Sequence, residues 1–235
     1  MLTRRPLKAV IFDLDNTLYP YEPCHRRGLA RAHALFRTLP ETSRIPFMAA
    51  YLKARRAVAR HHRATATSHN RLLYFRRMCE PVFHHHAAHH AVALHQAYWD
   101  GYFSAMRLDR SAKPLLKQLK RRGLRIGILT DLMEEVQLRK VARLGLGPYV
   151  DAVVTSEEVG REKPDPRMFR TMLRKLGTTP ACSLIVGDDY RKDVVGGKRA
   201  GLATVWVIDR RRAAAPRGRS ADLIIPTLRA LAGHL

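Results

Sequence analysis

Six short apolar runs, each ending beside a polar residue, restrict what this chain of 235 residues can fold into. They occupy residues 8–12, 125–129, 150–154, 183–187, 204–208 and 222–225. Runs this apolar are typical of strands that are buried on both faces, as in a parallel sheet. Between the later runs, helical periodicity is found at residues 112–122, 134–144, 166–176, 192–200 and 228–235. This alternation predicts an α/β domain with three layers, in which helices cover both faces of a parallel sheet.

The interval between the first two runs breaks this alternation. Residues 20–110 contain no convincing strand and are rich in Ala, Arg, Leu and His, with helical patterning. Such a segment is too long to be a single helix that connects two parallel strands. We therefore expect an inserted all-helical domain at 20–110, and an α/β domain made of residues 1–19 and 111–235. The Arg-rich segment 210–220 is expected to be a solvated loop.

Acidic residues stand at the ends of two predicted strands. They are Asp13, Asp15, Asp188 and Asp189, and Asp193 follows at the start of the next helix. Ligands of open parallel sheets bind beyond the carboxyl ends of the strands, so Asp13 and Asp188 are expected to be neighbours in space. Clustered carboxylates repel one another unless a cation joins them, and oxygen donors without Cys or His favour Mg²⁺. The alternative is that Asp15 caps a helix and Asp188 only ends a strand.

Two other segments carry groups that suit a phosphate. Thr130 and Asp131 follow the second predicted strand, where a hydroxyl and backbone N–H groups can bind phosphate oxygens. Lys163 lies between Glu162 and Pro164, in a stiff loop just before a predicted helix. The alternatives are that Thr130 caps a helix and that Lys163 is a solvated surface residue.

Taken together and in this order, these segments resemble the haloacid dehalogenase superfamily of aspartate-nucleophile hydrolases. The matching segments are Asp13-Leu-Asp15-Asn-Thr17, Thr130, Lys163-Pro-Asp-Pro, and Gly187-Asp188-Asp189 with Asp193 and Gly196-Gly-Lys-Arg-Ala-Gly201. The resemblance covers the whole chain, because the predicted insert lies where the family has its helical cap. It implies a Rossmann-like core with a C1-type cap that closes over the substrate. Asp131 stands where an asparagine is commoner, which adds a negative charge near the expected phosphate site.

The resemblance also implies the roles of the site residues. Asp13 would be the nucleophile that receives the phosphoryl group, and Asp15 would protonate the leaving alcohol and later deprotonate the water. An aspartate suits the first role because it is anionic at neutral pH and needs no base to activate it. Mg²⁺ would be held by Asp13, the backbone carbonyl of Asp15, and Asp188, with Asp193 and Asp189 outside this set. The residues implied at the phosphoryl group are Thr130, Lys163, Asp131 and Thr17.

These roles predict a Mg²⁺-dependent phosphatase for a small phosphomonoester, of the sugar phosphate or nucleotide class, that forms a phospho-aspartyl intermediate. A 2-haloacid dehalogenase is the alternative within the family. It needs no metal and no leaving-group acid at the position of Asp15, so Asp15 together with Asp188 favours phosphate. Phosphonate cleavage would need a Schiff-base lysine in the cap, where only Lys53 is available.

The chain is strongly basic, with 43 Lys and Arg against 20 Asp and Glu and a formal net charge of +23. This charge favours anionic partners, which include both phosphorylated metabolites and nucleic acids. A basic nucleic-acid-binding module without catalysis is therefore the alternative from another class of function. Aromatic residues make up only 7% of the chain, which is few for stacking on single strands, and specific nucleic-acid binding is not expected.

The cellular location and the oligomeric state are constrained only by features that the sequence lacks. The apolar runs are far too short to span a membrane, and the first ten residues lack the apolar segment of a signal peptide. Cys24, Cys79 and Cys182 are far apart and form no metal-binding spacing, which fits a reducing compartment. We expect a cytoplasmic protein without membrane attachment, either a monomer or a homodimer.

Two features of the predicted insert bear on ligands. Five histidines lie between His84 and His90, and on one helix the pairs four residues apart could hold a transition metal. No acidic or Cys residue is near them, so a solvated helix face is expected. The candidate substrate contacts in or next to the cap are Tyr19, Tyr21, His69, Asn70 and Arg71. For these residues the alternatives are packing at the hinge, as for Tyr19, and solvation, as for Arg71.

Overall fold

The computed structural model describes residues 3, 5–40, 42, 44–208 and 221–235, so the loop expected at 210–220 lies outside the described residues. The chain divides into two compact units. One unit is formed by Met1–Pro20 and Arg107–Leu235, and it contains every strand of the described residues. The other unit, Tyr21–Met106, contains only helices.

The first unit is built on a six-stranded sheet with the order β3-β2-β1-β4-β5-β6, in which every neighbouring pair is parallel. Its strands are β1 (Ala9–Phe12), β2 (Arg125–Thr130), β3 (Ala152–Thr155), β4 (Ser183–Gly187), β5 (Ala203–Val207) and β6 (Leu223–Ile225). β1 and β4 are buried along their whole length, because helices cover both faces of the sheet. The predicted α/β fold with a parallel sheet is confirmed.

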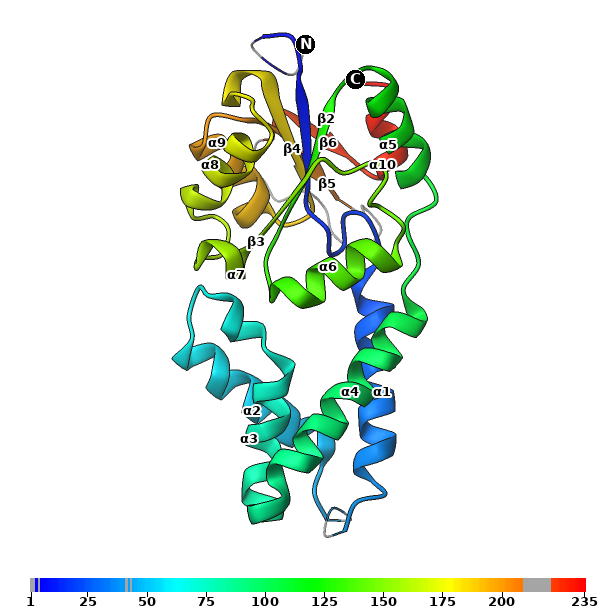
Figure 1. Cartoon of the computed structure of the whole chain (residues 1–235), viewed down its shortest axis with the longest axis vertical. Coiled ribbons are helices and arrows are strands. Elements are labelled where there is room, and N and C mark those ends of the chain that lie inside the picture. The colour runs from blue at the N-terminus through cyan, green and yellow to red at the C-terminus, as the bar shows by residue number, and fades with distance from the viewer. Residues whose placement is uncertain (1–2, 4, 41, 43, 209–220) are drawn as a thin grey trace. The chain divides into compact units, whose positions relative to one another are not determined.

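Helices form the outer two layers, with α8 and α9 on one face of the sheet and α5 and α10 on the other (Figure 1). The helices of this unit are α5 (Ala112–Arg121), α6 (Glu134–Arg143), α7 (Ser156–Val159), α8 (Pro166–Lys175), α9 (Gly196–Arg199) and α10 (Leu228–Leu231). Met168, Phe169 and Met172 of α8 share one apolar cluster with Ile11 and Ile185 of the central strands. This packing fixes β1 and β4, from which the acidic residues project.

Two predicted helices differ from those observed. The helix expected at 192–200 begins with a wider, π-helical segment at Tyr190–Val195, which α9 then continues. The Asp189 side chain accepts a hydrogen bond from the backbone N–H of Lys192 at 2.9 Å and so starts this segment earlier than expected. The helix expected to reach residue 235 ends at Leu231, followed by turns.

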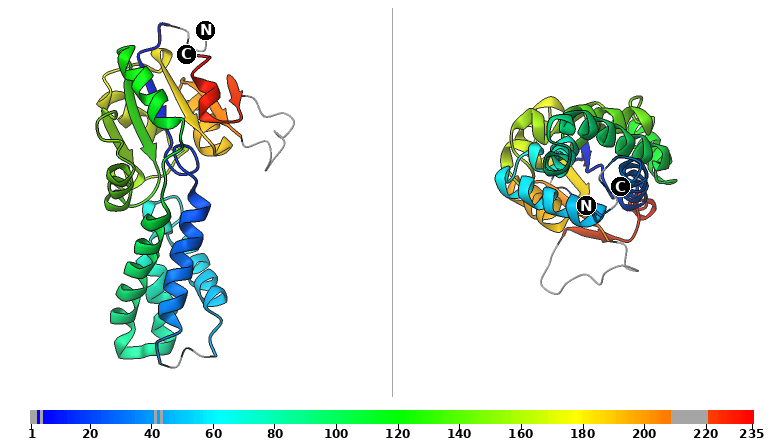
Figure 2. Two further views of the ribbon diagram at one scale, coloured as in Figure 1. Left: turned by 90° about the vertical axis from the view of Figure 1, so that its right-hand side faces the viewer. Right: turned by 90° about the horizontal axis from the view of Figure 1, so that it is seen from below.

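The helical unit consists of four main helices, α1 (Tyr21–Phe36), α2 (Phe47–His61), α3 (Arg71–Phe83) and α4 (Ala87–Ala105). α1 and α4 run side by side (Figure 2). Gly28 permits this approach, because a Cβ at this position would lie 2.8 Å from the carbonyl oxygen of Tyr98. None of the helices in the described ranges is long and apolar enough to cross a membrane.

The histidine-rich segment does not form the single helix that the paired spacing requires. α3 ends at Phe83, His84 has a φ of 45°, and residues His84–His86 form a 3₁₀ turn before α4 begins. His85 and His86 therefore precede the helix that carries His89 and His90. The expected single helix was wrong, because the chain reverses direction between α3 and α4, whereas the expected solvation agrees with the exposure of His84–His86 and His89. These histidines form no three-ligand cluster among the described residues.

Candidate active site

The site begins at the carboxyl end of β1, where the parallel register sets the positions of its residues. Phe12 pairs with Ile128 of β2 and with Val186 of β4, so all three strands end at one edge of the sheet. Asp13 directly follows Phe12, and its backbone N–H donates to the carbonyl of Val186 at 2.9 Å. The sheet thereby brings together residues that are more than 170 positions apart in the chain.

Three carboxylates gather at this edge. Asp13, Asp188 and Asp193 each offer an oxygen, and these oxygens lie within 4.8 Å of one another. Gly187 makes this approach possible, because a Cβ there would lie 2.2 Å from the carboxyl carbon of Asp193. The prediction that Asp13 and Asp188 become neighbours agrees with this geometry. Asp193 also belongs to this cluster, although the sequence analysis placed it outside the set of residues expected to hold Mg²⁺.

Lys163 is the cation of this cluster. Its buried ammonium donates to Asp13 Oδ1 at 2.6 Å, to Asp193 Oδ1 at 2.7 Å and to the carbonyl of Leu129 at 3.0 Å. All three N–H bonds of the ammonium are therefore directed to fixed acceptors. Burial works to lower the pKa of Lys163, but Asp13 and Asp193 outweigh it and raise the pKa well above its usual range. Lys163 is thus a permanent positive charge.

One lysine does not neutralise three carboxylates. Burial, followed by repulsion from Asp13 and Asp193, raises the pKa of Asp188 to about 8. Burial and Asp13 raise the pKa of Asp193 to about 7 against the opposing effect of Lys163, and burial also raises the pKa of Asp13. The cluster therefore carries more negative charge than its surroundings stabilise, and it offers only oxygen donors. A hard divalent cation fits both properties.

Thr17 and Thr130 lie beside the acidic cluster. Thr17 Oγ1 donates to Asp13 Oδ2 at 3.1 Å, so Asp13 has a fixed partner on each of its oxygens. Thr130 is buried at the end of β2, where the side-chain amide of Gln137 donates to its hydroxyl. Gln137 thereby fixes the orientation of a hydroxyl that sequence reasoning assigned to phosphate binding.

Asp131 is occupied by protein groups. Its Oδ1 accepts from the backbone N–H of Lys163 at 2.9 Å, and its Oδ2 accepts from Lys192 Nζ at 2.8 Å. The carboxylate therefore holds the loop of Lys163, and its extra negative charge is paired with Lys192. Sequence reasoning identified Asp131 but not this lysine. Asp189, expected near the metal, is exposed and caps the segment Tyr190–Val195.

Asp15 has a partner that sequence reasoning missed. Lys140 of α6 is fully buried, and its ammonium donates to both carboxylate oxygens of Asp15. The hydroxyl of Tyr19 donates to Asp15 Oδ1 at 2.5 Å. The feature that could have indicated this partner is the buried face of α6, on which Gln137 and Lys140 lie between Val136 and Val141. Two polar residues on an otherwise apolar helix face indicate buried partners.

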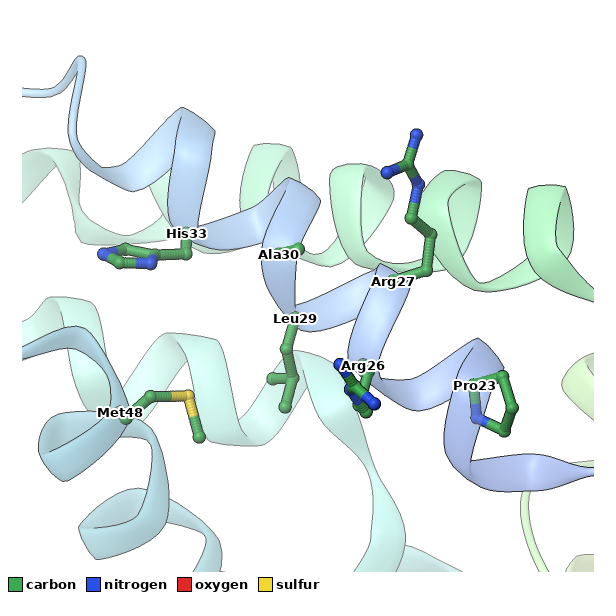
Figure 3. Close-up of a pocket in the computed structure, with 7 residues that line it drawn as sticks. All are labelled: Pro23, Arg26, Arg27, Leu29, Ala30, His33 and Met48. Atoms are coloured by element: carbon green, nitrogen blue, oxygen red, sulfur yellow. The ribbon is translucent and has the colours of Figure 1, made fainter.

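A groove on the helical unit has a different chemical character (Figure 3). It runs along α1 and is lined by Arg26, Arg27, His33 and Met48 among others. Among the residues that the structure describes, its lining includes no carboxylate and no member of the acidic cluster. The three clustered carboxylates lie instead at the strand ends of the α/β unit.

A family model described as haloacid dehalogenase-like hydrolase matches residues 7–201. The chain belongs to this family. Among curated relatives, ribulose-1,5-bisphosphate 5-phosphatase of Halopiger xanaduensis is 43% identical over 201 residues, which cover 84% of this chain and 83% of that protein. Glyceraldehyde 3-phosphate phosphatase of Methanopyrus kandleri is 33% identical over 216 residues, covering 86% of this chain and 84% of that protein.

Solved structures of the family share the fold. A 2-haloacid dehalogenase from Pseudomonas syringae pv. Tomato superimposes with a TM-score of 0.79 at 23% identity, covering 96% of each chain. A HAD phosphatase from Thermococcus onnurineus gives a TM-score of 0.75 at 25% identity, covering 97% of each chain. This haloacid dehalogenase-like hydrolase therefore has curated relatives named phosphatases, and its acidic cluster has the donors for the divalent metal that such phosphatases use.

Proposed function

We propose that this haloacid dehalogenase-like hydrolase is a Mg²⁺-dependent phosphatase of small phosphorylated sugars, with Asp13 as the nucleophile. The observation that carries the proposal is the position of Asp13 between Lys163 and the carboxylates of Asp188 and Asp193. A carboxylate held between a fixed cation and a cation-binding cluster can approach an anionic phosphoryl group without overwhelming repulsion. The relatives named above support a sugar phosphate as the substrate.

In the first half of the reaction, a carboxylate oxygen of Asp13 bonds to phosphorus as the bond between phosphorus and the sugar oxygen breaks. The sugar oxygen takes a proton from Asp15 and leaves as the alcohol. Lys140 and the hydroxyl of Tyr19 then stabilise the ionised Asp15 that remains. Lys163 stabilises negative charge at the reacting carboxylate, and the Thr130 hydroxyl is proposed to contact the phosphoryl oxygens.

In the second half, Asp15 removes a proton from a water molecule whose oxygen bonds to the same phosphorus. The bond between phosphorus and Asp13 breaks, and inorganic phosphate leaves with Asp13 restored as a carboxylate. Asp15 regains the proton that it gave to the sugar, so the two halves balance.

The residues that would hold Mg²⁺ are Asp13, Asp188 and the backbone carbonyl of Asp15, with Asp193 at the edge of the same cluster. When bound, the ion supplies a Lewis acid that offsets negative charge on the phosphoryl oxygens. The raised pKa values of Asp188 and Asp193 support this assignment, because a bound cation removes the repulsion that contributes to them.

Two alternative functions, a 2-haloacid dehalogenase and a nucleic-acid-binding module, are less well supported. A 2-haloacid dehalogenase has no use for an acid at Asp15 or for a metal-binding carboxylate at Asp188, and both are present. Membership of a hydrolase family favours an enzyme over a basic module that only binds nucleic acid. The helical unit is proposed to be the cap that selects the substrate.

The test is phosphate release from a panel that contains a ketose bisphosphate, glyceraldehyde 3-phosphate and a nucleoside monophosphate, with Mg²⁺ or with EDTA, alongside chloroacetate. We expect Mg²⁺-dependent release that is fastest with sugar phosphates, and no chloride release. Asp13→Asn should lower kcat by a factor of at least about 10³. Glu135→Gln, which neutralises an exposed carboxylate on α6, should leave the rate unchanged. Full activity in Asp13→Asn, or no turnover of any monoester, would contradict the proposal.

A further inference from the structure

The α/β unit has a second groove, which runs along α5 beside the loop that precedes β3 and is called the α5 groove here. Its lining consists of five cations, two prolines and one tyrosine, namely Arg110, Lys113, Lys117, Lys120, Arg121, Pro114, Pro148 and Tyr149. All five cations are exposed, because the opposite face of α5 is the one that buries its leucines. Within the described part of the chain, no Asp or Glu lines this groove.

Most of these cations have no counter-charge. Lys120 Nζ lies 2.7 Å from Asp151 Oδ1. The other four form no ion pair with any Asp or Glu that the structure describes. On α6, by contrast, Arg139 pairs with Glu135 of the same helix at 3.1 Å. The α5 groove therefore presents a concentration of positive charge that the described residues do not neutralise.

The row of cations on α5 does not stabilise the helix that carries it. Lys113, Lys117 and Arg121 follow one another at intervals of four residues, and like charges at this spacing destabilise a helix. Lys113 lies in the first turn, where the helix dipole favours an acidic residue, but α5 contains none. An anion outside the chain would replace this repulsion by attraction.

The length of this row suits a chain of phosphates. From Lys113 to Arg121 the helix rises by about 12 Å, at about 1.5 Å per residue. One strand of a nucleic-acid duplex carries a phosphate about every 3.4 Å along its axis, so the row spans about three to four phosphates. The formal net charge of +23, for which the proposed hydrolysis does not account, has the sign that such a partner requires.

Other polyanions fit the α5 groove less well. An acidic protein or a membrane surface would need exposed apolar side chains, and the large exposed ones that the structure describes lie elsewhere, at Met48, Leu52, Val92 and Leu138. Binding of single strands depends on stacking of bases on aromatic rings, and the groove has one such ring, that of Tyr149. Contact with a duplex backbone needs only the cations.

We propose that the α5 groove binds the phosphate backbone of a nucleic-acid duplex without recognising its base sequence. Its Lys and Arg side chains would donate to phosphate oxygens and displace the counterions that surround them. The surface is separate from the acidic cluster, because Lys120 contacts Asp151 directly before β3 begins, whereas Asp13 follows the carboxyl end of β1. The inference is therefore independent of the proposed phosphatase activity.

Binding is measured by the fluorescence anisotropy of a short labelled DNA duplex in EDTA, over a range of salt concentrations. The duplex has 5′-hydroxyl ends, so it offers no phosphomonoester to the catalytic site. We expect the logarithm of the association constant to fall linearly with the logarithm of the salt concentration, with a slope of about −4 to −5 for five cations. A second duplex of different sequence should bind with an affinity within about twofold of the first.

Two triple variants of equal net charge locate the site. The first removes the row on α5, through Lys113→Gln, Lys117→Gln and Arg121→Gln. It should weaken binding by at least about tenfold at about 0.1 M salt and reduce the magnitude of the slope by about 2 to 3. The control removes three exposed cations from helices on the other face of the sheet, through Arg170→Gln, Arg174→Gln and Arg199→Gln (Figure 1). It should bind within about twofold of the parent.

Three results would overturn the inference. The parent protein might not bind the duplex even at low salt, a result that needs no variant. Equal weakening in the two folded triple variants would mean that the duplex responds to overall charge and not to the α5 groove. Displacement of the duplex by polyglutamate as effectively as by unlabelled duplex of equal charge would assign the groove to acidic polypeptides instead.

Discussion

The ammonium of Lys140 lies 2.8 Å from each carboxylate oxygen of Asp15, although 125 positions separate the two residues in the chain. The side chain of Lys140 is 1% exposed, whereas that of Asp15 is 24% exposed. The contact therefore fixes a carboxylate that solvent still reaches, two residues after the proposed nucleophile. A carboxylate that alternately gives and takes a proton needs such a fixed position.

Replacing Lys140 tests whether its contact with Asp15 positions this carboxylate for proton transfer. We expect Lys140→Met to lower kcat by between about tenfold and a hundredfold with a smaller change in KM, because Asp15 remains but loses its fixed partner. Lys175→Met, the same change at an exposed position of α8, is the control and should match the parent. An unchanged kcat in Lys140→Met would show that the ion pair is only structural.

The raised pKa values of Asp188 and Asp193 predict how stability depends on pH in the metal-free protein. In the folded state Asp188 holds its proton up to about pH 8 and Asp193 up to about pH 7, whereas in the unfolded chain both lose their protons near pH 4. Their contribution is therefore fully present below pH 4 and is lost as the pH rises toward 8. In EDTA, the free energy of unfolding should fall over this window by up to about 1.4 kcal/mol per pH unit for each group.

The measurement is urea unfolding in EDTA at several pH values, repeated with Asp188→Asn. The substitution should flatten the pH dependence, since one of the two groups no longer titrates. With saturating Mg²⁺ the fall should be smaller, because the ion competes with protons and binds more tightly as the pH rises. Stability that increases between pH 5 and pH 8 without metal would contradict the assignment of repelling carboxylates.

The two contacts of Asp131 can be separated by substitution. Asp131→Asn keeps an oxygen acceptor for the backbone N–H of Lys163 and loses the charge paired with Lys192. We expect it to retain kcat/KM within about threefold, whereas Asp131→Ala should lose about tenfold, because the loop of Lys163 loses its anchor. Steady-state kinetics on the same substrate compare the two. Equal losses in both variants would mean that the ion pair with Lys192, and not the loop contact, is what matters.

Gly187 leaves room for the carboxylate cluster. In Gly187→Ala the new methyl group would lie 2.2 Å from the carboxyl carbon of Asp193, which must then move away from Asp13 and Lys163. We expect Mg²⁺ affinity to fall by at least about tenfold, with kcat reduced as well. Calorimetric titration with Mg²⁺ measures the first effect. Gly147→Ala, where a Cβ meets nothing within 4 Å, should bind Mg²⁺ like the parent.

Local pattern was enough to predict the sheet and the residues at its edge. Each strand carries its signal within a few residues, because burial on both faces requires a continuous apolar run. The acidic residues follow these runs directly, so their meeting at one edge depends only on parallel strands lying side by side. For this reason Asp13 and Asp188 could be identified from the strand ends, whereas Lys163 was identified through the motif that resembles the family.

The sequence by itself determined the α/β fold, the positions of its strands and the acidic residues at their ends, since these follow from short-range patterning. The tertiary structure alone decided that the buried Lys140 pairs with Asp15 and that Lys192 pairs with Asp131. These relations depend on which face of a helix is covered and on what lies opposite it. Burial and ion pairing join residues remote in the chain, and the free energy of a buried charge is set by neighbours that only the packed structure supplies.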